Sequence, residues 1–323
     1  IMSSDWSSDV CSSDLADQSL RGNPEIVALF AHRLPKDQHQ DDLRAELLRM
    51  ARGRHALVGR IPDPMRKIVR NHLYQFLERM PEDFDLRGAS IGNLVLTAGY
   101  LDNRRLLDPV IYIFSKLVQA RGVVRPVINS FLHLVAELED GTRVLGQHNL
   151  TGKETGPIAS PVTRIHLTAD LDDPQPVEPV IRKKIAAQIA EAELICYPMG
   201  SFYSSVVANL LPRGVGRAVA ENPCPKVFVP NPNADPEAPG MGVAERTAVL
   251  LDALRADDPD AIRPRDVLQF VLVDEKRGAY PGGLDKDAVA ALGVEVVHCP
   301  LVSDESAPYF DPELLAPVLL SLT

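Results

Sequence analysis

A short segment in the second half of the chain has the residue types of a phosphate-binding turn. An apolar run from Leu194 to Tyr197 ends in a Pro-Met-Gly-Ser turn, and apolar residues recur at helical spacing from Val206 to Leu211. This pattern predicts a buried strand, a tight turn and a helix. Gly200 would let a ligand approach the backbone closely, and an anion would meet free N–H groups at the helix start. Hydroxyl groups near that start belong to Ser201, Ser204 and Ser205.

The same pattern also has a purely structural interpretation. Serine is among the commonest residues at the start of a helix, so Ser201 could serve only as a cap. The turn also lacks the G-x-x-x-x-G-K-[ST] pattern of a P-loop. The local pattern alone therefore favours a capped helix, and a ligand site needs support from other parts of the chain.

Composition indicates a globular chain and excludes some classes of partner. The 323 residues are 45% hydrophobic with a mean hydropathy of −0.05, which is enough apolar material for a substantial core. A net charge of −10 and a pI near 5.3 argue against nucleic acid or an anionic membrane as a partner. No apolar run approaches the roughly 20 residues that span a bilayer, and the N-terminus lacks a signal-peptide pattern. We therefore expect a cytoplasmic protein.

The cysteines and histidines do not have the spacing of a metal site. The four cysteines form no C-x-x-C pair, and all but the first fall in or beside apolar runs, so we expect buried, reduced thiols. His298 and Cys299 are adjacent at a strand end and would point to opposite faces, which favours a structural role. The other strand histidines are scattered without ligand spacing. The residues considered are Cys11, Cys196, Cys224, Cys299, His133, His148 and His166.

The first third of the chain is predicted to be helical. Residues 1–15 repeat Ser-Ser-Asp three times without apolar periodicity, and we interpret them as a non-native leader. Helical periodicity then dominates residues 16–121, where Gly92 and Asn93 interrupt an apolar helix start. As structure, Ser90 would cap that helix and Gly92 would allow close packing. The predicted helices are Pro24 to Arg33, Asp41 to Ala51, Pro64 to Met80, Ile91 to Leu101 and Pro109 to Gln119.

Residues 122–323 are predicted to build the sheet. Strands are expected over 131–138, 142–146 and 163–167, with a hairpin turn at Glu139–Gly141. Strands and helices then alternate, which predicts an α/β fold with a parallel sheet covered on both faces. The alternating segments are helix 180–191, strand 194–197, helix 203–211, strand 226–230, helix 243–255, strand 267–273, helix 285–292, strand 294–298 and helix 312–321. A G-x-G-x-x-G loop, which such folds often carry after their first strand, does not precede Pro24.

Five stretches, in this order and spacing, resemble the superfamily of 2-phospho-L-lactate transferase (CofD) and the gluconeogenesis factor (YvcK-like) proteins. The central stretch, from Gly200 to Leu211, is similar to Gly-Ser-Leu-Tyr-Thr-Ser-Ile-Ile-Pro-Asn-Leu-Leu, and the segment from Lys226 to Asn231 is similar to Lys-Val-Tyr-Val-Cys-Asn. The remaining matches are Pro24 to Arg33, Leu86 to Leu94 with its Ser-Ile-Gly-Asn-Leu, and Gly122 to Pro126 together with Leu138 to Gly141.

The resemblance implies a fold and a ligand class. The fold would be a three-layer α/β/α Rossmann-like parallel sheet with a helical insertion, forming a single domain over residues 16–323. The ligand would contain a nucleotide: in the transferase branch a guanosine diphosphate-linked group transferred with Mg²⁺, and in the YvcK-like branch a uridine diphosphate sugar bound for regulation. The turn around the ligand's phosphates would consist of Gly200, Ser201, Tyr203, Ser204 and Asn209. The same cleft would be bordered by Gly92, Asn93 and Asn231.

The chain also departs from the family pattern. Ala89 stands where the YvcK-like pattern has His, Met199 stands where it has Gly, and Pro232 to Glu237 only loosely matches the usual Pro-Gly-Glu-Thr region. The family's N-terminal strand, glycine loop and metal-binding aspartate pair have no counterpart. These departures indicate a CofD-related side branch that is truncated at its N-terminus.

Three functions remain open at this point. The intact parent would be a transferase that passes a phospho-group to an alcohol, or a nucleotide-sugar sensor without turnover. An assembly role is disfavoured because the turn is the best-matched part of the chain. The apolar helix at Ile111 to Val118 could form the interface of a homo-oligomer, although a core role explains it equally well.

Overall fold

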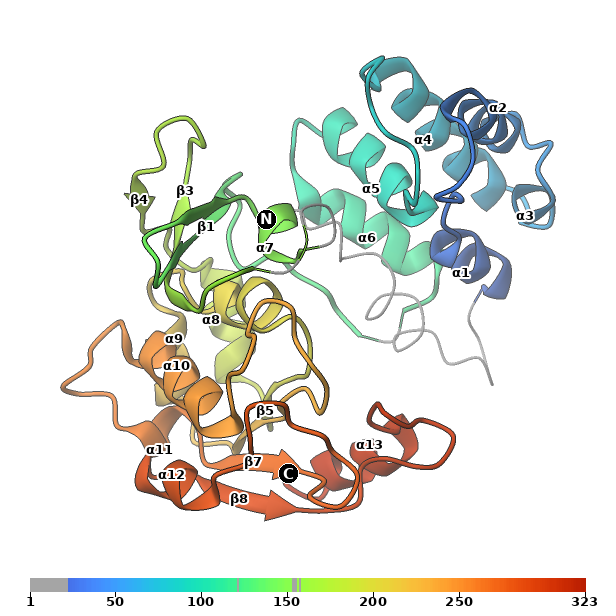
Figure 1. Cartoon of the computed structure of the whole chain (residues 1–323). Helices are drawn as coiled ribbons and strands as arrows, with labels where there is room; N and C mark the ends of the chain where they lie inside the picture. Colours follow the sequence, from blue (N-terminus) through green and yellow to red (C-terminus); the bar gives the residue numbers. More distant parts are fainter. Residues whose placement is uncertain (1–22, 121, 153–155, 157) are drawn as a thin grey trace. The chain divides into compact units, whose positions relative to one another are not determined.

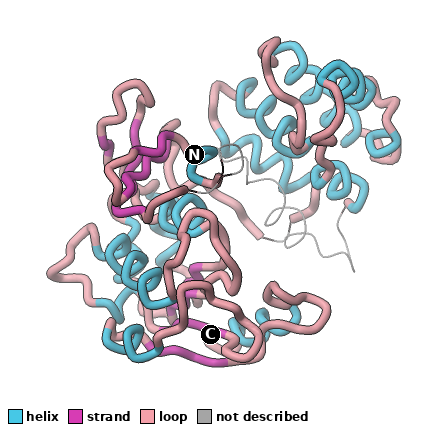
Figure 2. The backbone as a smooth tube through the Cα atoms, in the orientation of Figure 1, coloured by secondary structure: helices cyan, strands magenta, loops and turns pink. Residues whose placement is uncertain are grey.

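The chain forms two compact units. The computed structural model describes residues 23–120, 122–152, 156 and 158–323. One unit ends at Asn129 and the other runs from Ser130 to Thr323 (Figure 1). In the described residues the first unit contains helices and loops, and all eight named strands belong to the second (Figure 2). No described helix has the length and apolar character needed to cross a membrane.

The helical unit confirms the five predicted helices to within a few residues. Its core contains aliphatic side chains at helical spacing, such as Leu43, Leu47 and Met50 on one face of a helix, each 0% exposed. A four-residue helix at Ala56–Gly59 was not predicted, because one turn is too short to show periodicity. The helices are α1 Pro24–Ala31, α2 Gln40–Ala51, α3 Ala56–Gly59, α4 Met65–Arg79, α5 Ile91–Asp102 and α6 Leu107–Leu117.

The second unit begins with an antiparallel sheet in the order β2-β1-β3-β4. Its strands are β1 His133–Leu138, β2 Arg143–Leu145, β3 Val162–Thr168 and β4 Pro176–Val177, and α7 Gln147–Leu150 follows β2. The predicted hairpin at Glu139–Gly141 is confirmed, since Val135 pairs with Leu145 across it and the Gly141 amide donates to the Leu138 carbonyl at 3.0 Å. These early strands therefore form a sheet of their own.

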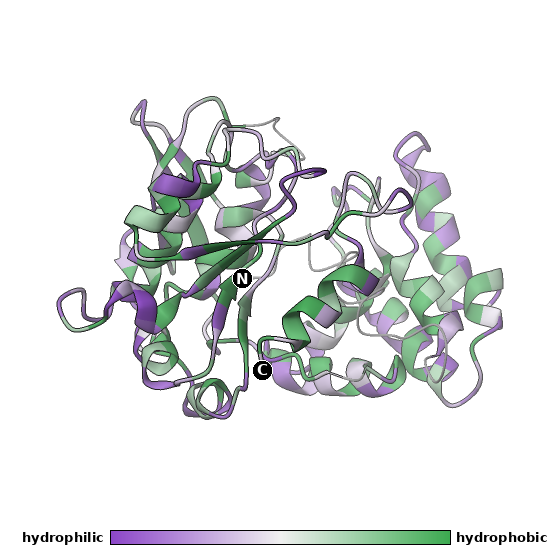
Figure 3. Ribbon diagram, turned by 90° about the horizontal axis from the view of Figure 1, so that it is seen from below, coloured by the Kyte–Doolittle hydropathy of each residue, from purple (hydrophilic) through white to green (hydrophobic). Residues whose placement is uncertain are grey.

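The α/β fold is confirmed by a second, parallel sheet in the order β5-β6-β7-β8. Its strands are runs of apolar residues, as expected for strands with both faces buried, and they appear hydrophobic in Figure 3. The strands are β5 Ile195–Tyr197, β6 Lys226–Phe228, β7 Phe270–Val273 and β8 Glu295–His298. The helices are α8 Lys183–Ala190, α9 Val215–Glu221, α10 Val243–Arg255, α11 Pro264–Val267, α12 Lys286–Ala291 and α13 Pro312–Leu320.

Helices cover both faces of the parallel sheet. The right-handed crossovers between successive strands place α9, α10 and α12 on one face. On the other face, Leu315, Val318 and Leu319 of α13 pack against a cluster that contains Val227 of β6 and Leu272 of β7. This arrangement agrees with the predicted three layers and leaves the loops after the strands at one edge.

Candidate functional site

The carboxyl ends of the four parallel strands meet at one edge of the sheet. The segments that follow them are 198–201 after β5, 229–242 after β6, 274–285 after β7 and 299–311 after β8. Ligands of open α/β sheets bind outside this edge because loops and helix starts converge there. The predicted phosphate turn is therefore in the expected place, and all four segments belong to the second unit.

The helix predicted over 203–211 is wrong. The segment forms a π-helical turn over Phe202–Val206 and a 3₁₀ turn over Val207–Asn209, and the side chain of Ser201 makes no capping hydrogen bond. Regular helix begins only at Val215, in the unpredicted helix α9. A regular helix start at Ser201 cannot therefore supply the anion site.

Two carboxylates account for this local irregularity. Asp235 Oδ2 accepts the backbone N–H of Phe202 at 2.7 Å, and Glu237 Oε2 accepts the N–H of Ser204 at 2.8 Å. The Ser204 hydroxyl also donates to Glu237 Oε1. Both carboxylates come from the segment after β6, so side chains more than 30 residues away take the amides that a bound anion would otherwise use. The turn is closed by the protein's own acidic groups.

Burial makes these carboxylates unusual. Glu237 is 0% exposed and Asp235 is 4% exposed. Burial raises the pKa of Glu237 to about 7, although the hydrogen bonds from Ser204 act in the opposite direction. Burial also raises the pKa of Asp235, and it raises the pKa of the neighbouring Tyr203 to about 12. The charge beside the turn therefore changes near neutral pH.

Arg246, in the first turn of α10, is a buried cation in this cluster. It is 2% exposed, and burial lowers the pKa of its guanidinium, while the charge of Asp235 acts in the opposite direction. Its Nη1 donates to the Asn231 carbonyl over a long 3.5 Å, and its Nε has no hydrogen-bond partner among the described residues. In the described part of the chain, no carboxylate lies within 4.0 Å of the guanidinium. Most of its hydrogen-bonding capacity is thus unused.

The predicted turn residues divide into accessible and structural ones. Tyr203 is 2% exposed, and its hydroxyl donates to the Val162 carbonyl and the Met241 sulfur at 3.4 Å each, which is a packing role. Asn209 is exposed and donates to the Ser205 carbonyl at 2.7 Å. The backbone carbonyl of Asn231 connects the same region to Arg246. The ligand roles predicted for these residues stay predictions.

Gly200 is not a glycine for reasons of fold. Its φ lies outside the left-handed region, and a Cβ added there would meet only the Ser205 Cβ, at an ordinary 3.6 Å. Among the described residues, no hydrogen bond leaves the backbone N–H of Gly200 or Ser201. The fold therefore tolerates a side chain at Gly200, and two amide groups beside it remain available to an anion.

Gly92 and Asn93 lie in the other unit, at the start of α5. A Cβ on Gly92 would lie 2.9 Å from the Phe30 carbonyl oxygen of α1, which explains this glycine by helix packing. The Ser90 hydroxyl donates to the same carbonyl at 3.3 Å and does not cap α5 by its side chain. The predicted position of Gly92 and Asn93 at the ligand cleft stays a prediction.

We expect Gly92→Ala to lower the free energy of unfolding of the helical unit by about 1–3 kcal/mol, because its Cβ would force α1 and α5 apart. Urea denaturation followed by helical circular dichroism measures this. Gly59→Ala is the matched control, since its Cβ would lie 4.0 Å from the nearest atom. Unchanged stability together with weaker ligand binding would instead make Gly92 a ligand-contacting glycine.

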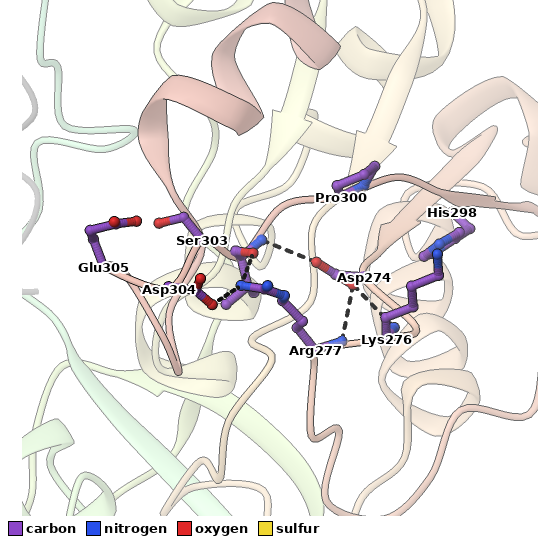
Figure 4. A pocket seen from close by; sticks show the side chains of 9 residues that line it. Asp274, Lys276, Arg277, His298, Pro300, Ser303, Asp304 and Glu305 are labelled. Carbon is purple, nitrogen blue, oxygen red and sulfur yellow. Dashed lines mark hydrogen bonds and ion pairs between the residues drawn. The ribbon is translucent and has the colours of Figure 1, made fainter.

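A hollow of about 340 Å³ lies where β7 and β8 end (Figure 4). Asp274, directly after β7, is 2% exposed and accepts four backbone N–H groups, two from its own loop and two from Leu301 and Val302. Although burial acts to raise it, these donors hold the pKa of Asp274 below its usual value. Asp274 therefore joins the two loops that form the hollow.

The side chains around the hollow carry charges of both signs. Arg277 Nη1 binds Asp304 Oδ1 at 2.8 Å, and His298 Nδ1 accepts the Glu275 N–H at 3.1 Å. The prediction of a structural His298 thus identified one of its contacts but not the hollow. The lining residues are Asp274, Lys276, Arg277, His298, Pro300, Val302, Ser303, Asp304 and Glu305.

The described residues do not fit the Mg²⁺ that the resemblance implies. No group of three or more His, Cys, Asp or Glu side chains in the described ranges is arranged to hold a metal ion. Asp235 and Glu237 come nearest in type, but their oxygens accept backbone N–H groups, and burial disfavours their charged forms. The prediction that no metal ligand lies among the named site residues agrees with this geometry.

Comparisons with known proteins agree on one family. The family model described as 2-phospho-L-lactate transferase CofD matches residues 24–302. The gluconeogenesis factor of Bacillus subtilis is 30% identical over 240 residues, covering 71% of this chain and 69% of that protein. A Nostoc protein that carries the same name provisionally is 31% identical over 250 residues, covering 73% of this chain and 50% of its own length. The chain thus spans about half to two thirds of these relatives.

A solved structure supports the fold. The crystal structure of a UPF0052 family member from Bacillus halodurans superposes with a TM-score of 0.58 at 22% identity, covering 79% of this chain and 82% of that chain. At this identity the likeness concerns the fold alone. It agrees with the Rossmann-like α/β arrangement of the second unit and its added helices.

Proposed function

The chain belongs to the CofD family, and from this premise we propose that it binds a nucleotide-diphosphate-linked small molecule at the carboxyl edge of its parallel sheet. The phosphates lie at the turn over 198–204, where Gly200 and Ser201 offer backbone N–H groups. Arg246 supplies the positive charge beside them. The observation that carries this proposal is Gly200, whose lack of a side chain the fold itself does not require.

Two activities are compatible with such a site. In the intact parent protein, the bound group would be transferred to an alcohol acceptor, as the name of the family model suggests. The alternative is a regulator that binds a nucleotide sugar without turnover. The relatives named as gluconeogenesis factors favour this second activity, and so does the poor fit of the described residues to a metal ion.

The remaining parts of the proposal follow from the ligand. Mg²⁺ would accompany the diphosphate and offset its charge, held by groups other than the site residues named above. The partner is a small molecule and not nucleic acid or a membrane, the protein is cytoplasmic, and self-association of the chain is a further expectation.

The proposal is tested by calorimetric titration of guanosine diphosphate, uridine diphosphate and a uridine diphosphate sugar, each with Mg²⁺. We expect saturable binding by the wild type and a loss of at least about tenfold in affinity, or about 1.4 kcal/mol, in Gly200→Ala. The added methyl group fits the free fold but occupies the space of the ligand. Ser201→Ala should weaken binding less, because it removes only a hydroxyl.

Gly59→Ala controls for a general effect of replacing glycine, since its site is equally roomy and lies in the helical unit. Equal affinities of Gly200→Ala and wild type would reject the turn as the phosphate site. The nucleotide that binds most tightly would then assign the chain to the transferase or the regulator branch.

A further inference from the structure

The hollow after β7 and β8 offers donors at one end and acceptors at the other (Figure 4). Lys276 and His298 lie at one end of the view, and Asp304 and Glu305 lie at the other, with Asp274 between them. Asp274 itself is satisfied by backbone N–H groups. The polar groups that remain for a ligand are therefore the four at the two ends.

The donor end has two unused groups. His298 Nδ1 accepts the Glu275 N–H, so the neutral imidazole carries its proton on Nε2 and can donate it to a ligand. The ammonium group of Lys276 forms no ion pair within the described ranges. Together they suit the oxygens of a phosphate group.

The acceptor end has carboxylate oxygens to spare. Arg277 binds only Oδ1 of Asp304, and Glu305 is exposed with no ion pair in the described part of the chain. Neighbouring hydroxyl groups on a sugar are the donors that such oxygens bind best, as acidic side chains do at ribose in dinucleotide sites. A carboxylate pair there would repel a second phosphate.

The spacing of the sheet relates this hollow to the turn. Neighbouring strands lie about 4.8 Å apart, so the turn after β5 and the hollow after β7 and β8 are separated by about 10–14 Å along the edge. A nucleoside diphosphate can extend over this span. The same edge thus has room for one ligand with its diphosphate toward the turn and its sugar at the hollow.

We propose that the hollow over β7 and β8 is the ribose subsite of the nucleotide ligand. Asp304 and Glu305 accept the ribose hydroxyls, and Lys276 and His298 hold the adjoining phosphate. This inference rests on the proposed function and assigns a specific part of the ligand to residues that had seemed to be solvated loop charges. It also predicts a preference for ribonucleotides over 2′-deoxyribonucleotides.

The test is calorimetric titration of the tighter-binding nucleoside diphosphate and its 2′-deoxy form against wild type, Glu305→Gln and Lys276→Met. We expect the wild type to bind the ribonucleotide about five- to tenfold more tightly than the 2′-deoxy form. Glu305→Gln should reduce that ratio by binding the ribonucleotide more weakly. Lys276→Met should weaken both forms by a similar factor. Glu191→Gln and Arg265→Met, at exposed positions outside the edge, should bind like wild type.

The outcomes separate the two proposals. If Gly200→Ala weakens binding while Glu305→Gln and Lys276→Met match wild type, the ribose subsite is wrong and the proposed function stands. Equal weakening of both nucleotides by Glu305→Gln would likewise overturn the contact to the ribose hydroxyl. If the wild type binds no nucleotide, the proposed function fails and this inference fails with it.

Discussion

Replacing Arg246 by leucine is expected to reduce nucleotide affinity by at least about 100-fold, or about 2.7 kcal/mol, without lowering the stability of the fold. The guanidinium is buried, has one long hydrogen bond, and lies near Asp235 without reaching ion-pair distance. A buried charge so poorly paired contributes little to folding, and an apolar side chain of similar volume is often neutral or stabilising. A diphosphate beside the turn would give this charge its missing partner.

Two measurements on Arg246→Leu are needed, affinity by calorimetry and the free energy of unfolding by urea denaturation. Arg246→Lys should bind with intermediate affinity, because it keeps the charge but loses the planar pair of donors. The matched control is Arg255→Leu at the other end of α10, whose guanidinium donates to the Ile262 and Pro259 carbonyls. It should lower stability modestly and leave affinity unchanged. A large loss of stability with unaltered affinity in Arg246→Leu would assign the arginine to the fold.

The elements with strong periodicity could be predicted from the sequence, and those made by tertiary contacts could not. Strand β6 and helix α10 follow from an apolar run and a 3.6-residue repeat. The strand expected over 267–273 begins only at Phe270, because residues Pro264–Val267 form the short helix α11 with an acidic residue in its first turn. A single turn of helix leaves no periodic signal.

The site shows the same limit more sharply. The position of the Gly200 turn follows from its strand and glycine, but its π-helical form depends on Asp235 and Glu237, which bind its amides from 33 residues away. A loose match to a family motif was the only signal for those carboxylates. Arg246 had no signal, because an arginine in the first turn of a helix is ordinarily exposed.

The two subsites also differ in how visible they are. Asp304 and Glu305 look like any pair of acidic loop residues until β7 and β8 bring Lys276 and His298 to the same hollow. Sequence spacing gives no hint of this, since nearly 30 residues separate Lys276 from Asp304. Spatial convergence at the edge of a parallel sheet is produced by strand order, which periodicity alone does not reveal.

Replacing Glu237 by glutamine is expected to change the pH dependence of stability. The folded protein raises the pKa of Glu237 from 4.5 to about 7, so it holds this proton more tightly than the unfolded chain. The stabilisation from Glu237 is therefore fully present below about pH 4.5 and is lost as the pH rises through about 7, on the order of 3 kcal/mol in all. Glutamine does not titrate, so Glu237→Gln should gain that amount relative to wild type between pH 4.5 and 8.

Urea denaturation of both proteins across this range measures the effect as a difference, which removes the contribution of other titrating groups. Asp274→Asn provides a control of opposite sign. The pKa of Asp274 is held below its usual value, so the stability it contributes is lost as the pH falls. Parallel stability curves for wild type and Glu237→Gln would show that the glutamate does not hold a proton near neutral pH.

The same proton should control ligand affinity. Charged Glu237 binds the Ser204 amide and repels a diphosphate at the turn, whereas the protonated form does not carry that charge. Affinity for a uridine diphosphate sugar, whose diphosphate does not titrate in this range, should therefore rise by up to about tenfold from pH 8 to 6. Glu237→Gln should bind at pH 8 as tightly as wild type binds at pH 6, with little further change. A variant that keeps the full pH dependence would show that another group senses the proton and that the carboxylate at the turn does not oppose the ligand.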